Sequence, residues 1–445
     1  MKKLVLLISI FAVTMLCTAL LFVLPVSAVP ISCSGYCGAE GSNVQWTLNT
    51  MTGSLSIYGD GEMDDYSSKS APWSEYSSYI KSVQINYSNL NSNNVTHIGN
   101  RAFWGYSNLK AVVIRNGVQS IGDDAFAECF TLRTVEIGAS VTKIGNKAFY
   151  GCTDLFSVVF DNNSSLTKIG KYAFQNCTSL TRIKLPDSTT FVDHAAFMGC
   201  TKLERVTLPA SLKNIGSYML ADCTTLTEIT LPEGVEKIYG SAFRRCHKLT
   251  TVNFPSTLTQ IRASAFRGCK SLTQAILPES LTFADHAAFM GCTALNTLYI
   301  PGSLKTIPTY FAYECQNLKT LTIGDGVETI KNHAFEHCKG ALREVVIPNS
   351  VTSLGNGAFH MASQLSSVTL SNRVESIGKN AFAQCKNLKS IVIPASLQSL
   401  GANAFSACTA LKTVYYCGTQ ENWESNGFRT NSVLKYAKTN YNYQA

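Results

Sequence analysis

The chain has 445 residues, of which 45% are hydrophobic, 15% charged and 10% aromatic, and it carries 37 basic against 29 acidic side chains. This composition excludes an intrinsically disordered protein, because there is too little charge and too much apolar content for a chain that cannot bury a core. The net charge of +8 is mild and scattered, which argues against a nucleic-acid partner.

The first 28 residues have the pattern of an export signal. Two lysines precede an apolar run over residues 4–24, and a small-residue cleavage pattern ends at Ala28. A signal anchor is the alternative, because a run of about 20 apolar residues is long enough to span a bilayer. We therefore expect a mature chain that begins at Val29, has no further membrane span, and is secreted or held at the cell surface.

Residues 29–94 are predicted to form an N-terminal cap with a β-hairpin and one repeat-like strand. The segment WTLNTMTGSLSIYG, residues 46–59, predicts a hairpin that turns near Thr52 and Gly53 and covers the exposed edge of the first coil. Residues 80–85 already fit the strand pattern of the later repeats, so a strand precedes the first full unit. Residues 86–94 would then form an extra loop.

Residues 95–416 are predicted to form a repeat array, in which the phrase I-G-x-x-A-F-x-x-C recurs in fourteen units. The spacing between Phe positions is 23 residues, except for 25 across residues 161–165 and 24 across Gly340. Leu220 and Ala312 replace the Phe in two units. The sequence also has a longer period of four units. DHAAFMGCT occurs at residues 193–201 and again 92 residues later, at 285–293.

Each unit has the features of one coil of a solenoid. The residues after the cysteine follow L-x-x-V-x-I-P, whose alternation predicts a short strand, and the proline ends that strand because it has no N–H to donate. One coil buries too few apolar side chains to offset the conformational entropy of ordering it. The coils must therefore stack and be protected at both ends. Fourteen coils at a strand spacing of ~4.8 Å predict a rod or arc roughly 60 Å long.

The pattern C-x-x-L-x-x-V-x-I-P-x-x-V-x-x-I-G-x-x-A-F resembles the BspA-like leucine-rich repeats of bacterial surface and secreted proteins. Residues 37–85 are similar to the N-terminal cap of that family, and VYYCGTQENW at residues 414–423 is similar to its closing segment. Together the repeat and the resemblance imply an α/β-type repeat solenoid, mostly β with short helical or turn segments. We expect about 14 coils of 23 residues, a parallel sheet on the concave face, and a C-terminal cap over residues 417–445.

Twelve cysteines share one repeat position, three residues after the Phe position. Tyr106 and Ala362 stand there in the other two units, which indicates that the position needs a small or semi-apolar group more than a thiol. We predict a buried structural column of reduced thiols, because parallel side chains aimed into a core have poor angles for disulfides, and a zinc site would need sulfurs that converge from different coils. The column comprises Cys129, Cys152, Cys177, Cys200, Cys223, Cys246, Cys269, Cys292, Cys315, Cys338, Cys385 and Cys408.

Besides Cys17 in the predicted export signal, three cysteines stand outside this column. Cys33 and Cys37 could close a small loop at the cap, which would leave Cys417 unpaired; the sequence does not otherwise determine the disulfide connectivity.

No motif in the chain predicts catalysis. His333 and His337 are four residues apart, but HAFEH lacks the H-E-x-x-H order of zinc peptidases. His194 and His286 each follow an Asp in DHAAF and are predicted to lie in solvated or capping turns. The acidic run GDGEMDDY at residues 59–66 lacks the twelve-residue spacing of an EF-hand. Phosphate-loop and nucleophile-elbow motifs are absent from the sequence, so we expect no enzyme activity, no cofactor and no metal.

The outward-facing residues of the repeat strands are the remaining candidates for a ligand-binding site. The two residues that flank V in L-x-x-V-x-I project away from the core and form a mostly neutral, hydroxyl-rich face. Within it, three cations form one basic cluster, which suits anionic glycans or acidic proteins. The candidate ligand-binding residues are Arg182, Lys184, Arg205, Thr207, Glu228, Thr230, Thr251, Asn253 and Tyr299.

These observations favour a monomeric, secreted or cell-surface protein that binds host or bacterial surface proteins or glycans. The resemblance further implies adhesion to host or neighbouring cells. A structural envelope component or spacer without a specific ligand is the first alternative, which a large neutral face also allows. An enzyme accessory acting on surface polysaccharide is less favoured, because neither end of the chain supplies a convincing carboxylate pair or nucleophile.

Overall fold

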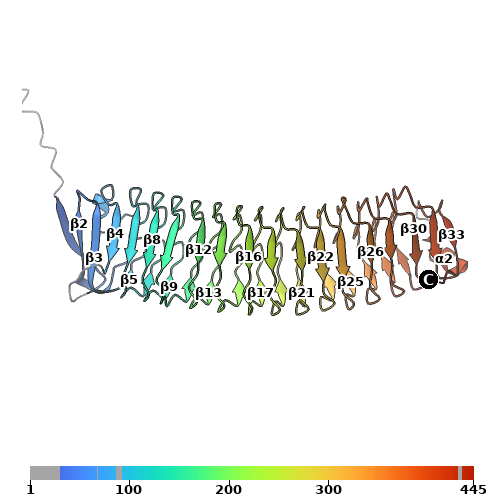
Figure 1. Ribbon diagram of the computed structural model, residues 1–445, viewed down its shortest axis with the longest axis horizontal. Helices are drawn as coiled ribbons and strands as arrows, with labels where there is room; N and C mark the ends of the chain where they lie inside the picture. The colour runs from blue at the N-terminus through green and yellow to red at the C-terminus, as the bar shows by residue number, and fades with distance from the viewer. Residues whose placement is uncertain (1–30, 68, 87–92, 429–432, 445) are drawn as a thin grey trace, which may run out of the picture.

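The computed structural model describes residues 31–67, 69–86, 93–428 and 433–444. Over these residues the chain winds into one long solenoid that has the strand β2 (Gly41–Asn49) near one end and β33 (Lys438–Asn440) at the other (Figure 1). The export signal predicted over residues 1–28 lies outside the described residues.

Each coil contributes one strand to each of two parallel ladders. The first ladder contains the L-x-x-V-x-I segments, which form strands of three or four residues. Their alternating burial places the central valine or its equivalent inside and its two neighbours outside, for example over Arg182–Lys184. These long strands are β4 (Ser82–Ile85), β6 (Ala111–Ile114), β8 (Thr134–Ile137), β10 (Ser157–Phe160), β12 (Arg182–Lys184), β14 (Arg205–Thr207), β16 (Glu228–Thr230), β18 (Thr251–Asn253), β20 (Gln274–Ile276), β22 (Thr297–Ile300), β24 (Thr320–Ile323), β26 (Glu344–Val346), β28 (Ser367–Thr369), β30 (Ser390–Ile393) and β32 (Thr413–Tyr416).

The second ladder contains the segments that end in the repeat's I-G, which form two-residue strands after a longer first member. These short strands are β5 (Asn93–Ile98), β7 (Ser120–Ile121), β9 (Lys143–Ile144), β11 (Lys168–Ile169), β13 (Phe191–Val192), β15 (Asn214–Ile215), β17 (Lys237–Ile238), β19 (Gln260–Ile261), β21 (Phe283–Ala284), β23 (Thr306–Ile307), β25 (Thr329–Ile330), β27 (Ser353–Leu354), β29 (Ser376–Ile377) and β31 (Ser399–Leu400).

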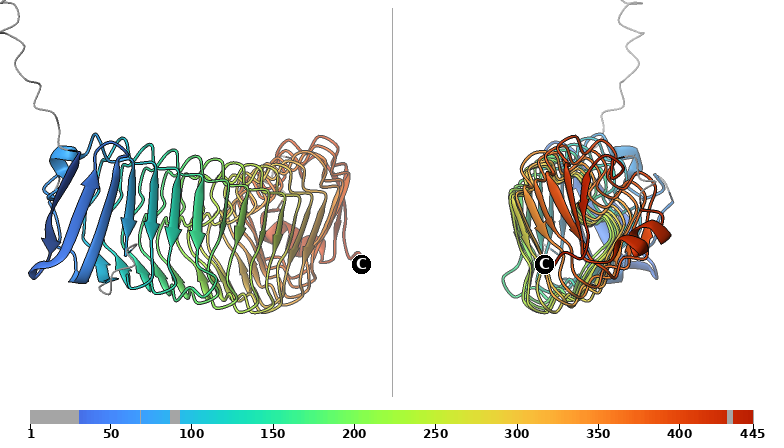
Figure 2. Two further views of the ribbon diagram at one scale, coloured as in Figure 1. Left: turned by 60° about the vertical axis from the view of Figure 1, so that its left-hand side comes forward. Right: turned by 90° about the vertical axis from the view of Figure 1, so that its right-hand side faces the viewer.

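Neighbouring coils pair in register, so that equivalent residues of successive repeats lie side by side, such as Val112 beside Val135. The coils lie one behind another around a shared interior (Figure 2). The predicted fold class is confirmed: the chain is a parallel β-solenoid of about 15 turns of about 23 residues with almost no helix. The connections between the described strands of the array are turns.

The ladder of long strands is not continuous along the described part of the chain. It is interrupted between β10 and β12, β14 and β16, β18 and β20, β24 and β26, and β28 and β30. The ladder of short strands is interrupted between β13 and β15 and between β21 and β23. The interior stays continuous across all of these breaks, because the buried residues form one apolar cluster.

A column of stacked aromatic rings runs through this interior. Trp73 of the cap stacks on Phe103 with ring centroids 5.2 Å apart, and Phe103 stacks on Phe126 at 5.0 Å. The column continues coil by coil but is interrupted at Leu220 and at Ala312. In the second of these coils the repeat's A-F order is reversed: Phe311 precedes Ala312, and its ring meets Phe289 edge-on at 81°.

The predicted burial of the cysteine column is confirmed. All twelve side chains are buried, and each thiol donates a hydrogen bond, of 3.1 to 3.6 Å, to the backbone carbonyl of the Phe-position residue in a preceding coil. Cys129 donates to Phe103 in this way, and Cys246 donates to Leu220. Burial raises the pKa of Cys129 to about 12. The reduced state of the column in solution stays a prediction.

The N-terminal cap consists of the antiparallel strands β1 (Ser32–Gly38), β2 (Gly41–Asn49) and β3 (Ser54–Glu62), followed by the short 3-10 helix η1 (Ser74–Tyr76). The predicted hairpin is confirmed, because Asn49 pairs with Ser54 across the turn. The strand β3 then pairs in parallel with β4 through its first half and with β5 through its second half. A single strand of the cap therefore starts both ladders of the solenoid.

Two predictions for the cap need correction. A small loop closed by Cys33 and Cys37 is wrong, because β1 is extended and residues four apart on a strand are separated by roughly 13 Å, far beyond the reach of a disulfide. The bounds predicted for the extra loop, residues 86–94, are wrong, because residues 93 and 94 belong to β5. Asn86 donates from Nδ2 to the Val95 carbonyl at 3.0 Å, and residues 87–92 lie outside the described residues.

At the other end, the helix α2 (Gln420–Ser425) and the strand β33 (Lys438–Asn440) cover the last coil. β33 pairs in parallel with β32, and the buried ring of Trp423 packs against Tyr416 at 5.0 Å. This arrangement removes the exposed strand edge that the last coil would otherwise present. Among the residues that the structure describes, no helix has the length and apolar character to cross a membrane.

Candidate functional site

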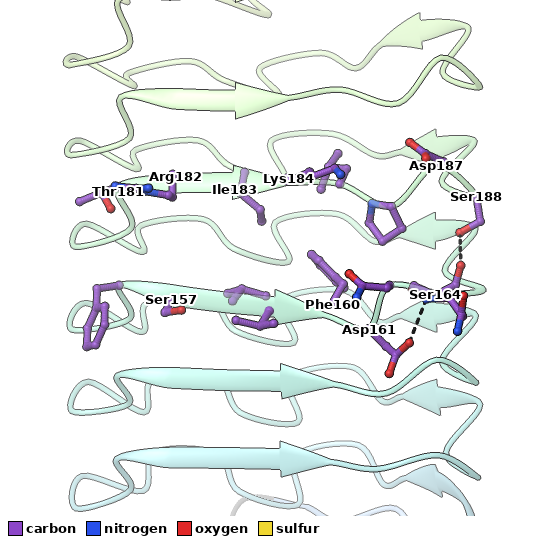
Figure 3. A pocket seen from close by; sticks show the side chains of 17 residues that line it. Ser157, Phe160, Asp161, Ser164, Thr181, Arg182, Ile183, Lys184, Asp187 and Ser188 are labelled. Carbon is purple, nitrogen blue, oxygen red and sulfur yellow. Dashed lines mark hydrogen bonds between the residues drawn. The ribbon is translucent and has the colours of Figure 1, made fainter.

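A groove with a volume of about 790 Å³ lies between β10 and β12, where the ladder of long strands is interrupted (Figure 3). We call it the first groove. It is lined by residues 156–164 and 181–188. This is the coil in which the repeat spacing increases from 23 to 25 residues, so the inserted residues follow β10 and form one end of the groove.

The inserted connection has a defined conformation. Asp161 accepts a hydrogen bond at its carboxylate from the Asn163 amide at 2.9 Å, and the Ser164 carbonyl accepts one from the Ser188 hydroxyl at 2.8 Å. The second of these bonds links the connection of one coil to that of the next, as the dashed line beside Ser188 shows (Figure 3). The end of the groove is therefore held by hydrogen bonds between the two coils that form it.

The wall formed by β10 and the residue before it is apolar. The Phe156 side chain is 48% exposed and the Val159 side chain is 55% exposed, although both belong to the wall of a groove. The repeat position of Val159 holds Glu136 in the preceding coil and Lys184 in the next one. Large exposed apolar side chains that line one groove favour a binding surface over a plain solvated one.

The wall formed by β12 is cationic. Arg182 and Lys184 are exposed on either side of the buried Ile183, as the alternation of a strand requires. Within the described part of the chain, neither cation has a carboxylate at ion-pair distance, whereas two coils earlier Glu136 pairs with Arg115 at 3.6 Å. The two walls of the first groove thus offer different chemistry to a ligand.

A second groove, of about 370 Å³, lies between β14 and β16 at the next interruption of the ladder. It is lined by the predicted site residues Arg205, Thr207, Glu228 and Thr230, together with Pro232. The structure therefore brings Arg182 and Lys184 together in the first groove and places these four residues in the second.

The other three predicted site residues lie outside both grooves. Thr251 and Asn253 are exposed on β18, and Tyr299 on β22 donates its hydroxyl proton to Glu279. Phe156, Val159 and the inserted residues line the first groove but were not among the predicted site residues. Two signals in the sequence pointed to them: the longer spacing of that repeat, and an apolar residue at a strand position that is charged in the coils on both sides.

The histidines that the sequence set aside have structural partners. Glu336 is buried and accepts hydrogen bonds from His333 Nδ1 at 2.5 Å and from His360 Nδ1 at 2.6 Å. His337 lies at 3.7 Å from the same carboxylate. The imidazoles point at the carboxylate and not at a common centre, and the structure's described ranges contain no group of three or more His, Cys, Asp or Glu side chains placed to hold a metal ion.

The predicted capping turns and the acidic run have local roles. The backbone amides of His194 and His286 each donate to the carboxylate of the preceding Asp at 2.7 Å, which confirms the capping-turn prediction. In the acidic run, Asp65 accepts hydrogen bonds from the backbone and side-chain amides of Asn100 at 2.7 and 2.8 Å. This carboxylate therefore joins the cap to the first coil.

The fold and the outward-facing grooves define a leucine-rich-repeat solenoid. In sequence, the chain matches the BspA type leucine rich repeat region (6 copies) over residues 74–200, 160–272, 236–362 and 339–443. Because these segments cover most of the chain, the protein belongs to the BspA-type leucine-rich-repeat family of bacterial surface proteins. No curated protein matches it in sequence.

Solved structures of bacterial leucine-rich-repeat proteins are similar to this chain. A leucine-rich repeat protein from Bacteroides ovatus has a TM-score of 0.63 and 22% sequence identity, and the match covers 93% of this chain and 99% of that one. A leucine-rich repeat protein from Eubacterium ventriosum has a TM-score of 0.46 and 26% identity, with 85% and 95% covered. A leucine rich cell surface protein from Faecalibacterium prausnitzii has a TM-score of 0.40 and 24% identity, with 94% and 96% covered. The first of these confirms the fold.

Proposed function

We propose that this protein is secreted or held at the bacterial cell surface, where it binds a macromolecular ligand, either a protein or a glycan, in adhesion to host or neighbouring cells. The observation that carries the proposal is the first groove, in which exposed apolar side chains face two cations without ion-pair partners among the described residues. The export pattern of residues 1–28 supports the location. The protein acts by binding and not by catalysis.

The test is the binding of purified residues 29–445 to arrays of matrix proteins, mucins and glycans at low and physiological salt. The R182E/K184E/R205E variant reverses the charge of the basic cluster. The K143E/K171E/K213E variant is the matched control, because it makes the same change in net charge at exposed lysines outside both grooves. We expect saturable binding that weakens at least tenfold in the first variant and is kept in the control.

The alternative predicts a different result. A structural envelope component or passive spacer needs no ligand, so the folded protein would bind nothing on these arrays at any salt concentration. Circular dichroism and a cooperative melting transition establish that each variant is folded before its binding is compared. Absence of binding from the folded wild-type protein would refute the adhesive function and favour the structural alternative.

A further inference from the structure

The length and direction of the first groove suit an extended chain. Its two walls are β10 with its flanking residues and β12 with its flanking residues, which run parallel to one another (Figure 3). At a rise of about 3.3 Å per residue, the four residues of β10 span roughly 13 Å. A peptide of about four residues in the extended conformation therefore matches the part of the groove that lies between the two strands.

The spacing of the cations matches a peptide in the same conformation. Arg182 and Lys184 are two residues apart on one strand and face the same side, so their Cα atoms are about 6.6 Å apart. An extended peptide also repeats every two residues, with successive side chains on opposite sides. Carboxylates at positions i and i+2 of such a peptide would meet Arg182 and Lys184 together, and the side chains between them would face the opposite wall.

The opposite wall is the apolar one. Ser157 and Val159 of β10 hold the same repeat positions as Arg182 and Lys184 of β12, and Phe156 precedes them. Apolar side chains at the alternate positions of the peptide would cover the exposed Phe156 and Val159. Each such contact removes apolar surface from water, while the carboxylates on the other side form charge-assisted hydrogen bonds.

The acidic side chains at one end of the first groove repel the carboxylates of a ligand from that end. Asp161 and Asp187 line the end formed by the two connections, away from Arg182 (Figure 3). Like charges repel there, so the carboxylates of a ligand are restricted to the stretch that faces Arg182 and Lys184. This asymmetry fixes the position of an acidic peptide along the groove.

Resting on the proposed function, we propose that the first groove binds an extended peptide segment of a protein partner, in which acidic residues alternate with apolar ones. The carboxylates face Arg182 and Lys184, and the apolar side chains face Phe156 and Val159. The matching two-residue period of strand and ligand favours a peptide over an anionic glycan as the occupant.

The probe is a fluorescein-labelled peptide of sequence GSEFEFEFGS, whose binding to residues 29–445 is followed by fluorescence anisotropy. We expect saturable binding that weakens with increasing salt. The matched peptide GSQFQFQFGS, which lacks only the charges, should bind at least tenfold more weakly. The peptide GSEEEFFFGS has the same composition as the probe without its alternation, and it should also bind more weakly.

Variants of the protein test whether the probe binds in the first groove. R182E/K184E should weaken binding of the probe at least tenfold, F156S/V159T should weaken it several-fold, and K143E/K171E should leave it unchanged. Equal binding by the two glutamate peptides, or binding that survives R182E/K184E, would contradict the inference. The peptide inference would also be contradicted if the probe does not bind, while a heparin oligosaccharide binds to the wild type and not to R182E/K184E. In that case the ligand of the first groove would be an anionic glycan.

The outcomes for the inference and for the proposed function are separable. If the array ligand binds and R182E/K184E leaves that binding intact, the inference fails and the adhesive function stands. If the probe binds as expected and no macromolecule on the arrays does, the groove is assigned and the adhesive function fails.

Discussion

The cysteines of the column do more than fill the interior. Each thiol donates to a backbone carbonyl of a preceding coil, so it ties two turns of the solenoid together at a point where no strand pairs. An Ala at this position fills space without donating, as Ala362 does, and Tyr106 donates from its hydroxyl to the Ser74 hydroxyl instead, at 3.4 Å. This hydrogen bond gives the thiol a structural role in most units.

Burial of the thiols makes the stability of the fold sensitive to alkaline pH. The pKa of the Cys129, Cys200, Cys292 and Cys338 thiols is raised from 9.0 to about 12, because burial disfavours the thiolate. The unfolded chain therefore loses these protons first. The stabilisation is complete below pH 9 and is lost as the pH rises from 9 towards 12, by about 1 kcal/mol per thiol at pH 10, so the four thiols together lose several kcal/mol.

The measurement is the urea midpoint of residues 29–445 between pH 7.5 and 10.5 with reductant present. We expect a flat midpoint up to about pH 8.5 and a steep fall above pH 9. The C129A variant should show a shallower fall, since it has one fewer titrating thiol. A midpoint that stays constant through pH 10.5 would show that the column is not buried as described.

At the scale of the elements, the reversed order of Phe311 and Ala312 is a local repacking of the aromatic column. Phe311 occupies the position of the repeat's Ala, and its ring fills the interior from there, edge-on to Phe289 at 5.4 Å. Ala312 leaves room for that ring at the ordinary Phe position. The two positions therefore share one ring volume, and each substitution depends on the other.

We expect the single variant A312F to be destabilised by about 1–3 kcal/mol through overpacking, and F311A by about 3–5 kcal/mol through the cavity it leaves. The double variant F311A/A312F restores the A-F order of the other coils, so it should lie within about 1.5 kcal/mol of the wild type. Urea unfolding of the four proteins measures the coupling. Additive effects of the two single changes would show that the two side chains do not share a volume.

The strands and turns were largely predictable from the sequence, because the same pattern of apolar and turn-forming residues recurs every 23 residues. The alternation in L-x-x-V-x-I located the long strands, and the turn at Thr52 and Gly53 located the hairpin. The loop between Cys33 and Cys37 was wrong because cysteine spacing does not reveal the extended backbone of β1.

The grooves were only partly predictable. β12 pairs with β14 and β14 does not pair with β16, although a proline lies two residues after each of the three strands. Nothing in these strands explains the difference, because the position of one coil relative to the next depends on packing along the whole interior. The cations of β12 were found from their outward positions, whereas the apolar wall required the structure to show Phe156 and Val159 beside them.

The whole molecule behaves as a stack in which each coil contacts its neighbours, so its length is adjustable in steps of whole coils. The two copies of DHAAFMGCT lie four units apart and occupy equivalent positions. Deleting residues 193–284 joins Val192 to Asp285 and removes four coils without changing the repeat register. The second groove is lost with them, while both strands of the first groove remain.

We expect this deletion variant to fold and to be shorter by about 19 Å, which is four strand spacings of ~4.8 Å. Small-angle X-ray scattering measures the change in maximum dimension. A deletion of residues 193–273 is the control: it removes about three and a half coils, breaks the register, and should unfold or aggregate. Equal behaviour of the two deletions would contradict the solenoid as described.

The strand β3, which pairs with both β4 and β5, has a consequence for how the chain reaches its native state. If the chain is exported as proposed, with its N-terminus first, this strand emerges before any coil. Each following coil would then meet a template for both of its strands, so we expect the stack to grow by addition in one direction. At every stage the unfinished edges of both ladders are exposed at the growing end, until α2 and β33 cover the last coil.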